Sequence, residues 1–212
     1  MNEYTIKEMV RDLICEAYFE SRFERSDDTV SVTEVTQCLR YSYFTRKEPR
    51  CVPQSYAMLL GIAGHRLFLS KLERLGFMVE KLVAEKRDGI KLVGRCDAWH
   101  PDLDIVLELK TCFKPPNEPY DDHVFQVRIY GALLKARKLY IVYIPRDGIN
   151  AMKVFYVHPD RKALDEALAR AKRLIDAMKT GEPPDPERGR WCRYCPYAFT
   201  CRKSQAKARP LV

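Results

Sequence analysis

The sequence lacks any long run of apolar residues and any start that resembles a signal peptide. A membrane-spanning helix needs about 20 consecutive apolar residues, and no stretch of the 212 residues approaches that length. The first residues, Met-Asn-Glu-Tyr, have neither the basic start nor the apolar stretch of a secretory signal. We therefore expect a cytoplasmic protein without a membrane partner.

Asparagine and glutamine are also scarce, with three and four copies, whereas charged residues make up 31% of the chain. This balance is typical of heat-stable proteins. Apolar residues account for 46%, which is too many for a disordered chain. Because no repeat or low-complexity segment is present, the length suits one substantial domain with a small appendage.

Eight cysteines stand out against this background. In a reducing cytosol disulfides are rare, although proteins of hyperthermophiles are an exception, and metal ligation is the stronger explanation for clustered cysteines. We therefore expect several of these thiols to hold a metal or a metal cluster.

The net charge of +8 is unevenly distributed along the chain. Residues 188–212 contain seven Lys and Arg and no Asp or Glu, and a second basic cluster comprises Arg40, Arg46, Lys47 and Arg50. Such clusters are either solvated surface or contacts to phosphate, where charge dominates the affinity.

Hydrophobic periodicity predicts helices first, and then strands that one helix interrupts. The predicted helices cover 6–23, a segment that begins at a capping box at Ser31 and carries Cys38, 54–75, 118–136 and 159–179. The predicted strands cover 79–87, 90–99, 104–111, 138–144 and 152–157, with a tight hairpin turn at Asp88-Gly89. This order predicts an α/β fold with a mixed central sheet, followed by a proline-rich linker from Gly181 to Pro186.

Two acidic residues and a lysine fall on neighbouring predicted strands. Glu108 and Lys110 point to the same face because side chains alternate along a strand, and a short turn could bring Asp97 beside Glu108. Two convergent carboxylates make a hard oxygen site suited to Mg²⁺ or Mn²⁺. A metal-bound water and a nearby lysine would suit hydrolysis of a phosphodiester.

Three neighbouring features add to this pattern. His65 lies in the apolar seam of a predicted helix, so it is either a core histidine or a third metal ligand. Gln126 and Tyr130 are four residues apart and share a helix face. Gly94 provides a position without a side chain near the acid, where backbone or DNA could approach closely.

Cys192, Cys195 and Cys201 form a second pattern, because a C-x-x-C step places two thiolates on one metal or cluster. A four-thiolate site needs one more cysteine. Cys38 is preferred and Cys51 is the second choice, whereas Cys15 and Cys96 are expected to pack as small apolar residues and Cys112 has no cysteine near it. Zinc and an iron–sulfur cluster both accept four thiolates.

Taken in order, these residues resemble the CRISPR-associated RecB-like exonucleases, the family called Cas four. The matching segments run from Thr33 to Cys201 and comprise Thr33-Glu34-x3-Cys38-x-Arg40, Gly61-x2-Gly64-His65, Gly94-x2-Asp97, Glu108-x-Lys110, Gln126-x3-Tyr130 and the cysteine triad Cys192, Cys195 and Cys201.

The resemblance implies a PD-(D/E)xK, restriction-endonuclease-like nuclease core that acts as a DNA exonuclease. His65, Asp97, Glu108 and the backbone carbonyl of Leu109 would bind Mg²⁺ or Mn²⁺. Lys110 would be the catalytic lysine, and Gln126 and Tyr130 would position DNA or that lysine. Cys38, Cys192, Cys195 and Cys201 would hold an iron–sulfur cluster, either [4Fe–4S] or [2Fe–2S].

The resemblance also implies a role and a division of the chain. The family trims DNA ends for CRISPR spacer acquisition, so CRISPR integrase proteins are expected partners besides DNA. An N-terminal helical region with the first cluster cysteine would cover 1–60, the RecB-like core 61–180 and the cluster-binding module 181–212. The alternative is a catalytically weak, cluster-bearing DNA-binding subunit that docks to an integrase complex.

Overall fold

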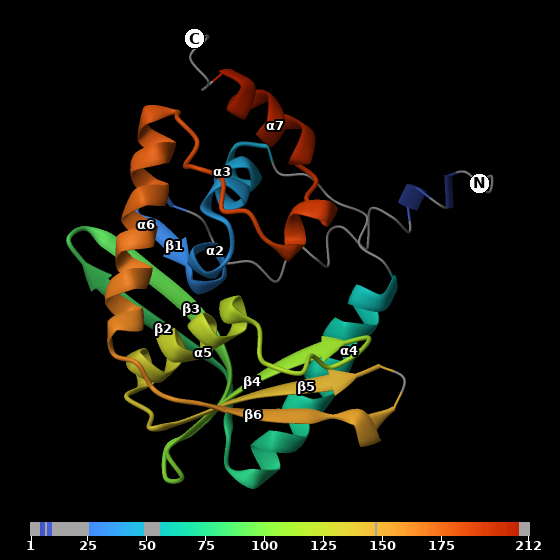
Figure 1. The fold of residues 1–212 in the computed structure, drawn as a ribbon. Coiled ribbons are helices and arrows are strands. Elements are labelled where there is room, and N and C mark those ends of the chain that lie inside the picture. Colours follow the sequence, from blue (N-terminus) through green and yellow to red (C-terminus); the bar gives the residue numbers. More distant parts are fainter. Residues whose placement is uncertain (1–4, 7, 10–25, 49–55, 147, 208–212) are drawn as a thin grey trace.

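A single mixed sheet organises the molecule (Figure 1). The computed structural model describes residues 5, 6, 8, 9, 26–48, 56–146 and 148–207. In this part of the chain the sheet has six strands, in the order β1-β3-β4-β5-β6 with β2 paired to β3. The strands are β1 (Thr29–Ser31), β2 (Met78–Arg87), β3 (Ile90–His100), β4 (Ile105–Cys112), β5 (Lys138–Pro145) and β6 (Lys153–Val157).

The sheet is mixed as expected, because β1 pairs parallel to β3 and β4 pairs parallel to β5, while the other pairs are antiparallel. The β2–β3 hairpin turns at Asp88 and Gly89, whose φ angles of 51° and 77° are those of a type I′ turn. The short strand β1 was not predicted, since three residues are too few for periodicity to show.

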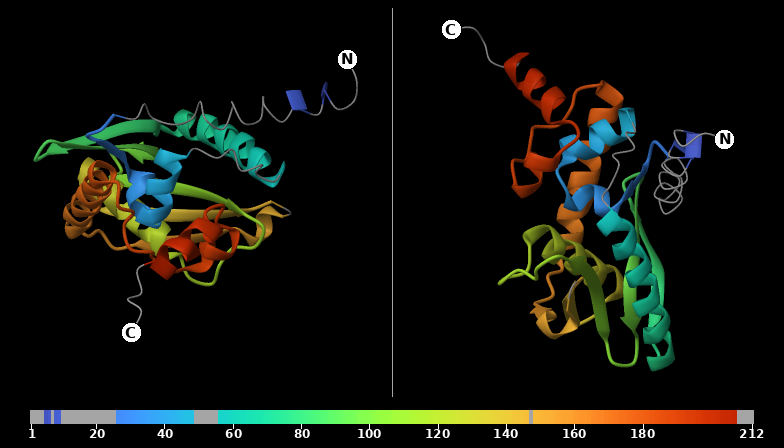
Figure 2. Two further views of the ribbon diagram at one scale, coloured as in Figure 1. Left: turned by 90° about the horizontal axis from the view of Figure 1, so that it is seen from above. Right: turned by 90° about the vertical axis from the view of Figure 1, so that its right-hand side faces the viewer.

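Helices cover both faces of the sheet (Figure 2). They are α2 (Val32–Thr36), α3 (Leu39–Lys47), α4 (Tyr56–Leu72), α5 (Asp121–Leu134), α6 (Lys162–Thr180) and α7 (Ala198–Lys207), with 3-10 turns η1 (Glu73–Leu75), η2 (Ile149–Ala151) and η3 (Arg190–Tyr194). α4 lies on one face, and α2, α5 and α6 lie on the other. The larger core forms on the α5–α6 face, where strand and helix side chains such as Ile141, Ile129 and Leu174 are buried.

Strand parity places the acidic pattern as the sequence predicts. Leu109 packs under α4 with Leu69 and Ala98, so Glu108 and Lys110 project to the opposite, α5 side. Cys96 is fully buried in the core, as predicted. The pairing of β3 with β4 is short, running from Ala98–Leu107 to His100–Ile105.

The capping box at Ser31 is confirmed, but the helix that it starts is shorter than predicted. Ser31 and Glu34 exchange both capping hydrogen bonds at the start of α2. That helix ends at Thr36, and Cys38 instead occupies the position preceding α3. The prediction was wrong because a sharp break in the backbone at Gln37, with ψ of 178°, separates the two helices.

Two arginines of the predicted basic cluster are internal rather than available to phosphate. Arg46 makes two hydrogen bonds of 2.8 and 2.9 Å to the carboxylate of Glu34 and another of 2.8 Å to the carbonyl of Thr29. Arg40 is buried and donates from Nε to the carbonyl of Pro184. Both arginines therefore hold the fold together.

The Glu34–Arg46 pair predicts a pH-dependent stability. Burial would raise the pKa of Glu34, but the hydrogen bond and charge of Arg46 outweigh it and lower that pKa. A carboxyl with a lowered folded-state pKa stabilises the protein above its ordinary pKa of 4.5, and this stabilisation is lost as the pH falls. At pH 7, Glu34→Gln is expected to lower the free energy of unfolding by about 3 kcal/mol.

The measurement is urea unfolding of both proteins between pH 3 and pH 7. Because protonated Glu34 resembles glutamine, the difference should shrink towards zero at the acid end. Glu85→Gln on the exposed strand β2 is the control and should leave the stability unchanged at every pH. A difference that persists undiminished at acid pH would contradict the ion-pair explanation.

The proline-rich segment after α6 is fixed to the domain rather than being a loose linker. Besides the Arg40 contact to Pro184, the guanidinium of Arg170 donates two hydrogen bonds, of 2.7 and 2.8 Å, to the carboxylate of Glu187. Arg170 also donates to the carbonyls of Val35 and Gln37. Sequence composition could indicate the end of the helix here, but not these contacts.

The predicted helix over 6–23 lies almost entirely outside the described residues. Cys15, Arg50 and Cys51 also lie outside them. Among the helices that the structure does describe, none combines the length and the apolar character needed to cross a membrane.

Candidate active site and cysteine cluster

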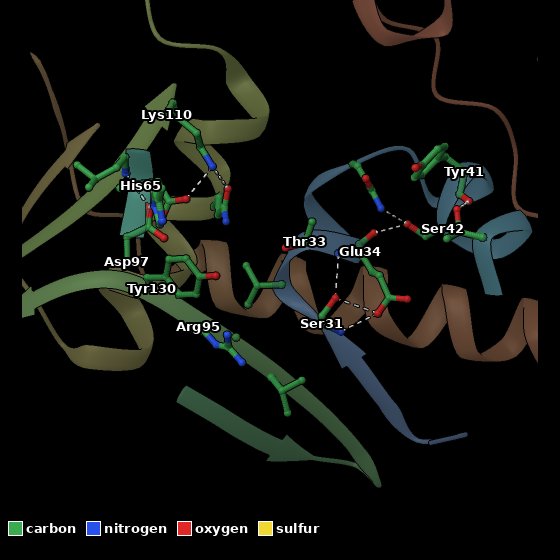
Figure 3. Close-up of a pocket in the computed structure, with 18 of the residues that line it drawn as sticks. Ser31, Thr33, Glu34, Tyr41, Ser42, His65, Arg95, Asp97, Lys110 and Tyr130 are labelled. Carbon is green, nitrogen blue, oxygen red and sulfur yellow. Dashed lines mark hydrogen bonds and ion pairs between the residues drawn. The ribbon is translucent and has the colours of Figure 1, made fainter. Parts of the chain in front are cut away.

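A pocket of about 380 Å³ opens where the sheet meets α2, α3, α4 and α5. Figure 3 shows two groups of side chains in it. One end holds the residues of the acidic pattern, and the other holds hydroxyl and amide groups of the α2–α3 region. The residues at the first end are His65, Asp97, Glu108, Leu109, Lys110, Gln126 and Tyr130, and those at the second include Ser31, Thr33, Gln37, Tyr41 and Ser42.

Asp97 directly precedes Ala98, the residue of β3 at which the pairing with β4 ends. Its Oδ2 accepts a hydrogen bond of 2.7 Å from the backbone N–H of Leu109 and lies 3.0 Å from Nε2 of His65. Burial would lower the pKa of His65, but the Asp97 carboxylate outweighs it and raises that pKa. His65 is therefore not an isolated core histidine but a partner of the first acid.

Glu108 is the most confined acid of the site, with 1% of its surface exposed. Burial, and then the charge of Asp97, raise the pKa of Glu108 to about 7. Its Oε1 accepts a hydrogen bond from Lys110, whereas its buried Oε2 has no hydrogen-bond partner among the described residues. An unpartnered buried carboxylate oxygen beside a second carboxylate fits a hard divalent cation.

Lys110 joins the acid to the helix behind it. Its Nζ lies 2.7 Å from Oε1 of Glu108 and 2.8 Å from Oε1 of Gln126. Burial would lower the pKa of Lys110, but the carboxylates of Glu108 and Asp97 outweigh it and raise that pKa. The lysine is therefore a fixed cation at the edge of the pocket.

Tyr130 and Gln126 lie side by side on α5, as their spacing predicts. Tyr130 is 2% exposed, and the neighbouring Gln126 side chain acts to lower the pKa of its phenol. Burial and then Glu108 raise the pKa of Tyr130 well above its ordinary value, so the phenol stays neutral. Tyr130 thus lies in the same pocket as the amide that holds Lys110.

Gly94 allows a close approach, but the group that approaches is a protein side chain. A Cβ atom at Gly94 would lie 2.6 Å from Cε1 of Tyr130 and 2.8 Å from Cγ2 of Val32. Any larger residue would push Tyr130 away from the pocket. The sequence indicated the close contact and did not identify its partner.

Three side chains near Lys110 were missed by sequence reasoning. Asp122 and His123 begin α5, and Tyr143 on β5 lies with its Oη 2.7 Å from Nδ1 of His123. Burial, and then the charge of Lys110, lower the pKa of His123 to about 3, so the imidazole is neutral. The only sequence signal was the run Asp121-Asp122-His123 at a helix start.

The four predicted cluster cysteines come together from both ends of the chain. Burial raises the pKa of Cys195, and the nearby thiols Cys38, Cys192 and Cys201 raise it further. All four are free thiols, with Cys38 just before α3, Cys192 in η3, Cys195 just after η3 and Cys201 in α7. Cys96 and Cys112 are free thiols elsewhere in the fold.

Neither site has the compact geometry of a bound metal. Over the described residues, no three His, Cys, Asp or Glu side chains converge as ligands of one ion. At the acidic site Lys110 and His65 instead neutralise the carboxylates. The donor types nevertheless match the expected groups, which are oxygens for Mg²⁺ or Mn²⁺ and thiolates for an iron–sulfur cluster.

Comparison with known proteins agrees with this arrangement. The CRISPR-associated exonuclease Cas4 of Saccharolobus solfataricus is 28% identical over 190 residues, which cover 84% of this chain and 89% of that protein. The crystal structure of SSO0001 superimposes with a TM-score of 0.70 at 24% identity, over 92% of this chain and 96% of that one. An alkaline exonuclease from Laribacter hongkongensis, LHK-Exo, gives 0.53 at 12% identity, over 91% and 100%.

The two solved structures show the same fold, and the curated relative agrees with the resemblance drawn from the motifs. A family model described as the PD-(D/E)XK nuclease superfamily matches residues 3–202. Asp97 and the segment Glu108-Leu109-Lys110 lie within that match and meet in one pocket. The α/β nuclease fold expected from the sequence is confirmed, and the chain belongs to the PD-(D/E)XK nuclease superfamily.

Proposed function

We propose that the chain is a metal-dependent DNA exonuclease whose reaction takes place at Asp97, Glu108 and Lys110. The observation that carries the proposal is the buried Oε2 of Glu108, which has no partner within the described protein and belongs to the same pocket as the Asp97 carboxylate. The exonuclease activity of the curated relative supports the choice of reaction.

The two carboxylates, His65 and the carbonyl of Leu109 would hold Mg²⁺ or Mn²⁺. Such an ion supplies a water of lowered pKa and neutralises charge on the phosphoryl group. Binding would require Glu108 to lose its proton, so metal affinity should increase as the pH rises.

The protein side chains would act around that centre. Lys110 is a cation held by Glu108 and Gln126, so it is positioned to orient the attacking water and to offset charge on the phosphate. Tyr130 would hold Gln126 in place. These residues stand on strands and a helix rather than on loops, which keeps their geometry precise.

The cysteines would hold an iron–sulfur cluster, [4Fe–4S] or [2Fe–2S], through Cys38, Cys192, Cys195 and Cys201. Their proximity supports a four-thiolate site, and the resemblance favours iron–sulfur over zinc. We also propose the division into an N-terminal region (1–60), a nuclease core (61–180) and a cluster-binding module (181–212). The name of the curated relative supports an association with CRISPR, and the resemblance drawn from the motifs implies spacer acquisition with integrase partners.

The test uses anaerobically purified protein and DNA labelled at either the 5′ or the 3′ end. Single- and double-stranded substrates are incubated with Mn²⁺, with Mg²⁺ or with EDTA. Cleavage is expected only with a divalent metal, and the time course of products from the two labels gives the direction of digestion. An enzyme that is inert on every substrate, yet binds DNA, would overturn the proposal in favour of a DNA-docking subunit.

A further inference from the structure

Two aromatic side chains stand exposed on the short helix that carries the first cysteines of the module. Trp191 is 57% exposed and Tyr194 is 69% exposed, and both lie on η3. In a 3-10 helix, residues three apart eclipse one another at a rise of about 6 Å. The indole and the phenol therefore form a short row on one side of η3.

Arginines with the same spacing form a second row beside the first. Arg193 lies over the ring of Tyr194 at 5.4 Å. Arg190 lies between two rings, 3.1 Å from the centroid of Tyr120 and 4.9 Å from that of Trp191. The rows together present aromatic faces and positive charge, the combination that binds single-stranded nucleic acid without reading its sequence.

Contacts with the start of α5 place these rows next to the catalytic pocket. Arg190 donates to Oδ1 of Asp122 at 2.6 Å, and the indole N–H of Trp191 donates to Oδ2 at 3.2 Å. Asp122 lies one helical turn before Gln126 on α5, and Gln126 binds Lys110. The indole is thus oriented by a residue that lies close to the proposed catalytic lysine.

The positive charge of the module favours a polyanionic partner over a basic or an apolar one. From residue 188 to the end, the chain carries seven Lys and Arg and no Asp or Glu. The nearest acid in contact with the rows, Asp122, is already neutralised by Arg190. Aromatic faces exposed within such a basic surface suit nucleobases joined by phosphates.

We propose that Trp191 and Tyr194 stack on consecutive bases of a single DNA strand and guide it to the catalytic pocket. The proposal deepens the function proposed above, on which its choice of DNA rests. Single strands are favoured because base faces inside a duplex are already covered by neighbouring pairs. Stacking requires no base-specific hydrogen bonds, so the surface would accept any sequence.

Indole fluorescence tests the contact directly. The chain has two tryptophans, so Trp99→Phe leaves Trp191 as the single reporter. The variant is titrated with a short oligothymidylate in EDTA, which allows binding without cleavage. Quenching that saturates with the oligonucleotide is expected, whereas an unchanged spectrum while the strand binds would overturn the proposal.

Variants then separate stacking from fold. Trp191→Ala and Tyr194→Ala are each expected to weaken oligothymidylate binding by about tenfold or more. Trp191→Phe loses the hydrogen bond to Asp122. It should nevertheless bind almost as well as the wild type, because it keeps an aromatic face. Tyr156→Ala, an exposed aromatic on β6, is the matched control and should have no effect.

If Trp191→Phe and Trp191→Ala weaken binding equally, the stacking role is overturned. Trp191 would then act only through its hydrogen bond to Asp122. Alanine variants that bind like the wild type would also overturn it. The proposed nuclease activity is tested separately by the cleavage assay. If the indole is quenched by DNA in a protein that cuts no substrate, the nuclease proposal is refuted and the stacking proposal stands.

Discussion

Replacing Glu108 by alanine is expected to lower the rate of metal-dependent DNA cleavage by at least about a thousandfold, equivalent to about 4 kcal/mol of transition-state stabilisation. The substitution removes the carboxylate whose Oε2 has no partner in the described part of the chain, and it also removes the hydrogen bond between Lys110 and Glu108. Both the metal site and the orientation of the lysine are therefore lost together. The measurement is the single-turnover rate on end-labelled DNA at saturating Mn²⁺.

Two companion proteins show whether the effect belongs to the chemistry. Glu85→Ala removes a surface glutamate from β2 and should leave the rate unchanged. Glu108→Gln keeps the shape of the side chain and its contact to Lys110, yet it should also lose most of the activity because an amide is a poorer ligand. Near-normal cleavage by Glu108→Gln would contradict a metal-binding role for this residue.

The second large effect is expected from Cys195→Ser, which should abolish the proposed iron–sulfur cluster and lower the stability of the chain. The four thiols come from α3 and from the last quarter of the sequence, so a cluster would link segments that are far apart. A group that binds only the folded state stabilises it by about 4 kcal/mol at a thousandfold excess over its dissociation constant. The unfolding temperature should accordingly fall by roughly 10 °C.

Iron and sulfide content, visible absorption and thermal unfolding of anaerobically purified protein measure this effect. Cys112→Ser, a half-buried thiol at the end of β4, serves as the control and should keep both the cluster and the stability. Stoichiometric zinc without iron in the wild-type protein would refute the iron–sulfur assignment. Four thiols without any bound metal under these conditions would refute the cluster itself.

The sequence was sufficient to predict the central part of this fold. Alternating faces in a strand place Glu108 with Lys110, and helix spacing places Gln126 with Tyr130. The Asp88-Gly89 turn sets the register of the β2–β3 hairpin, and Asp97 lies on the second strand of that hairpin. These relations are local, because each depends on a single element or on one turn.

Relations between distant elements were harder to predict. Arg40 and Arg46 look like phosphate ligands in the sequence, but carbonyl and carboxylate groups of other segments engage them. The contact of Asp122 with Arg190 and Trp191 joins residues almost seventy positions apart. Charge and spacing identify such residues as polar, and tertiary packing decides which group each one meets.

The attachment of the proline-rich segment to α2 and α3 can form only late in synthesis, because the two regions are far apart in the sequence. Three of the four thiols, and Glu187, which accepts a hydrogen bond from the backbone N–H of Leu39, are translated long after Cys38. At synthesis rates of about 5–20 residues per second, Cys38 waits on the order of ten seconds for its partners. A nascent chain therefore contains all the described strands of the sheet before it contains the segments that secure the α2–α3 wall of the pocket.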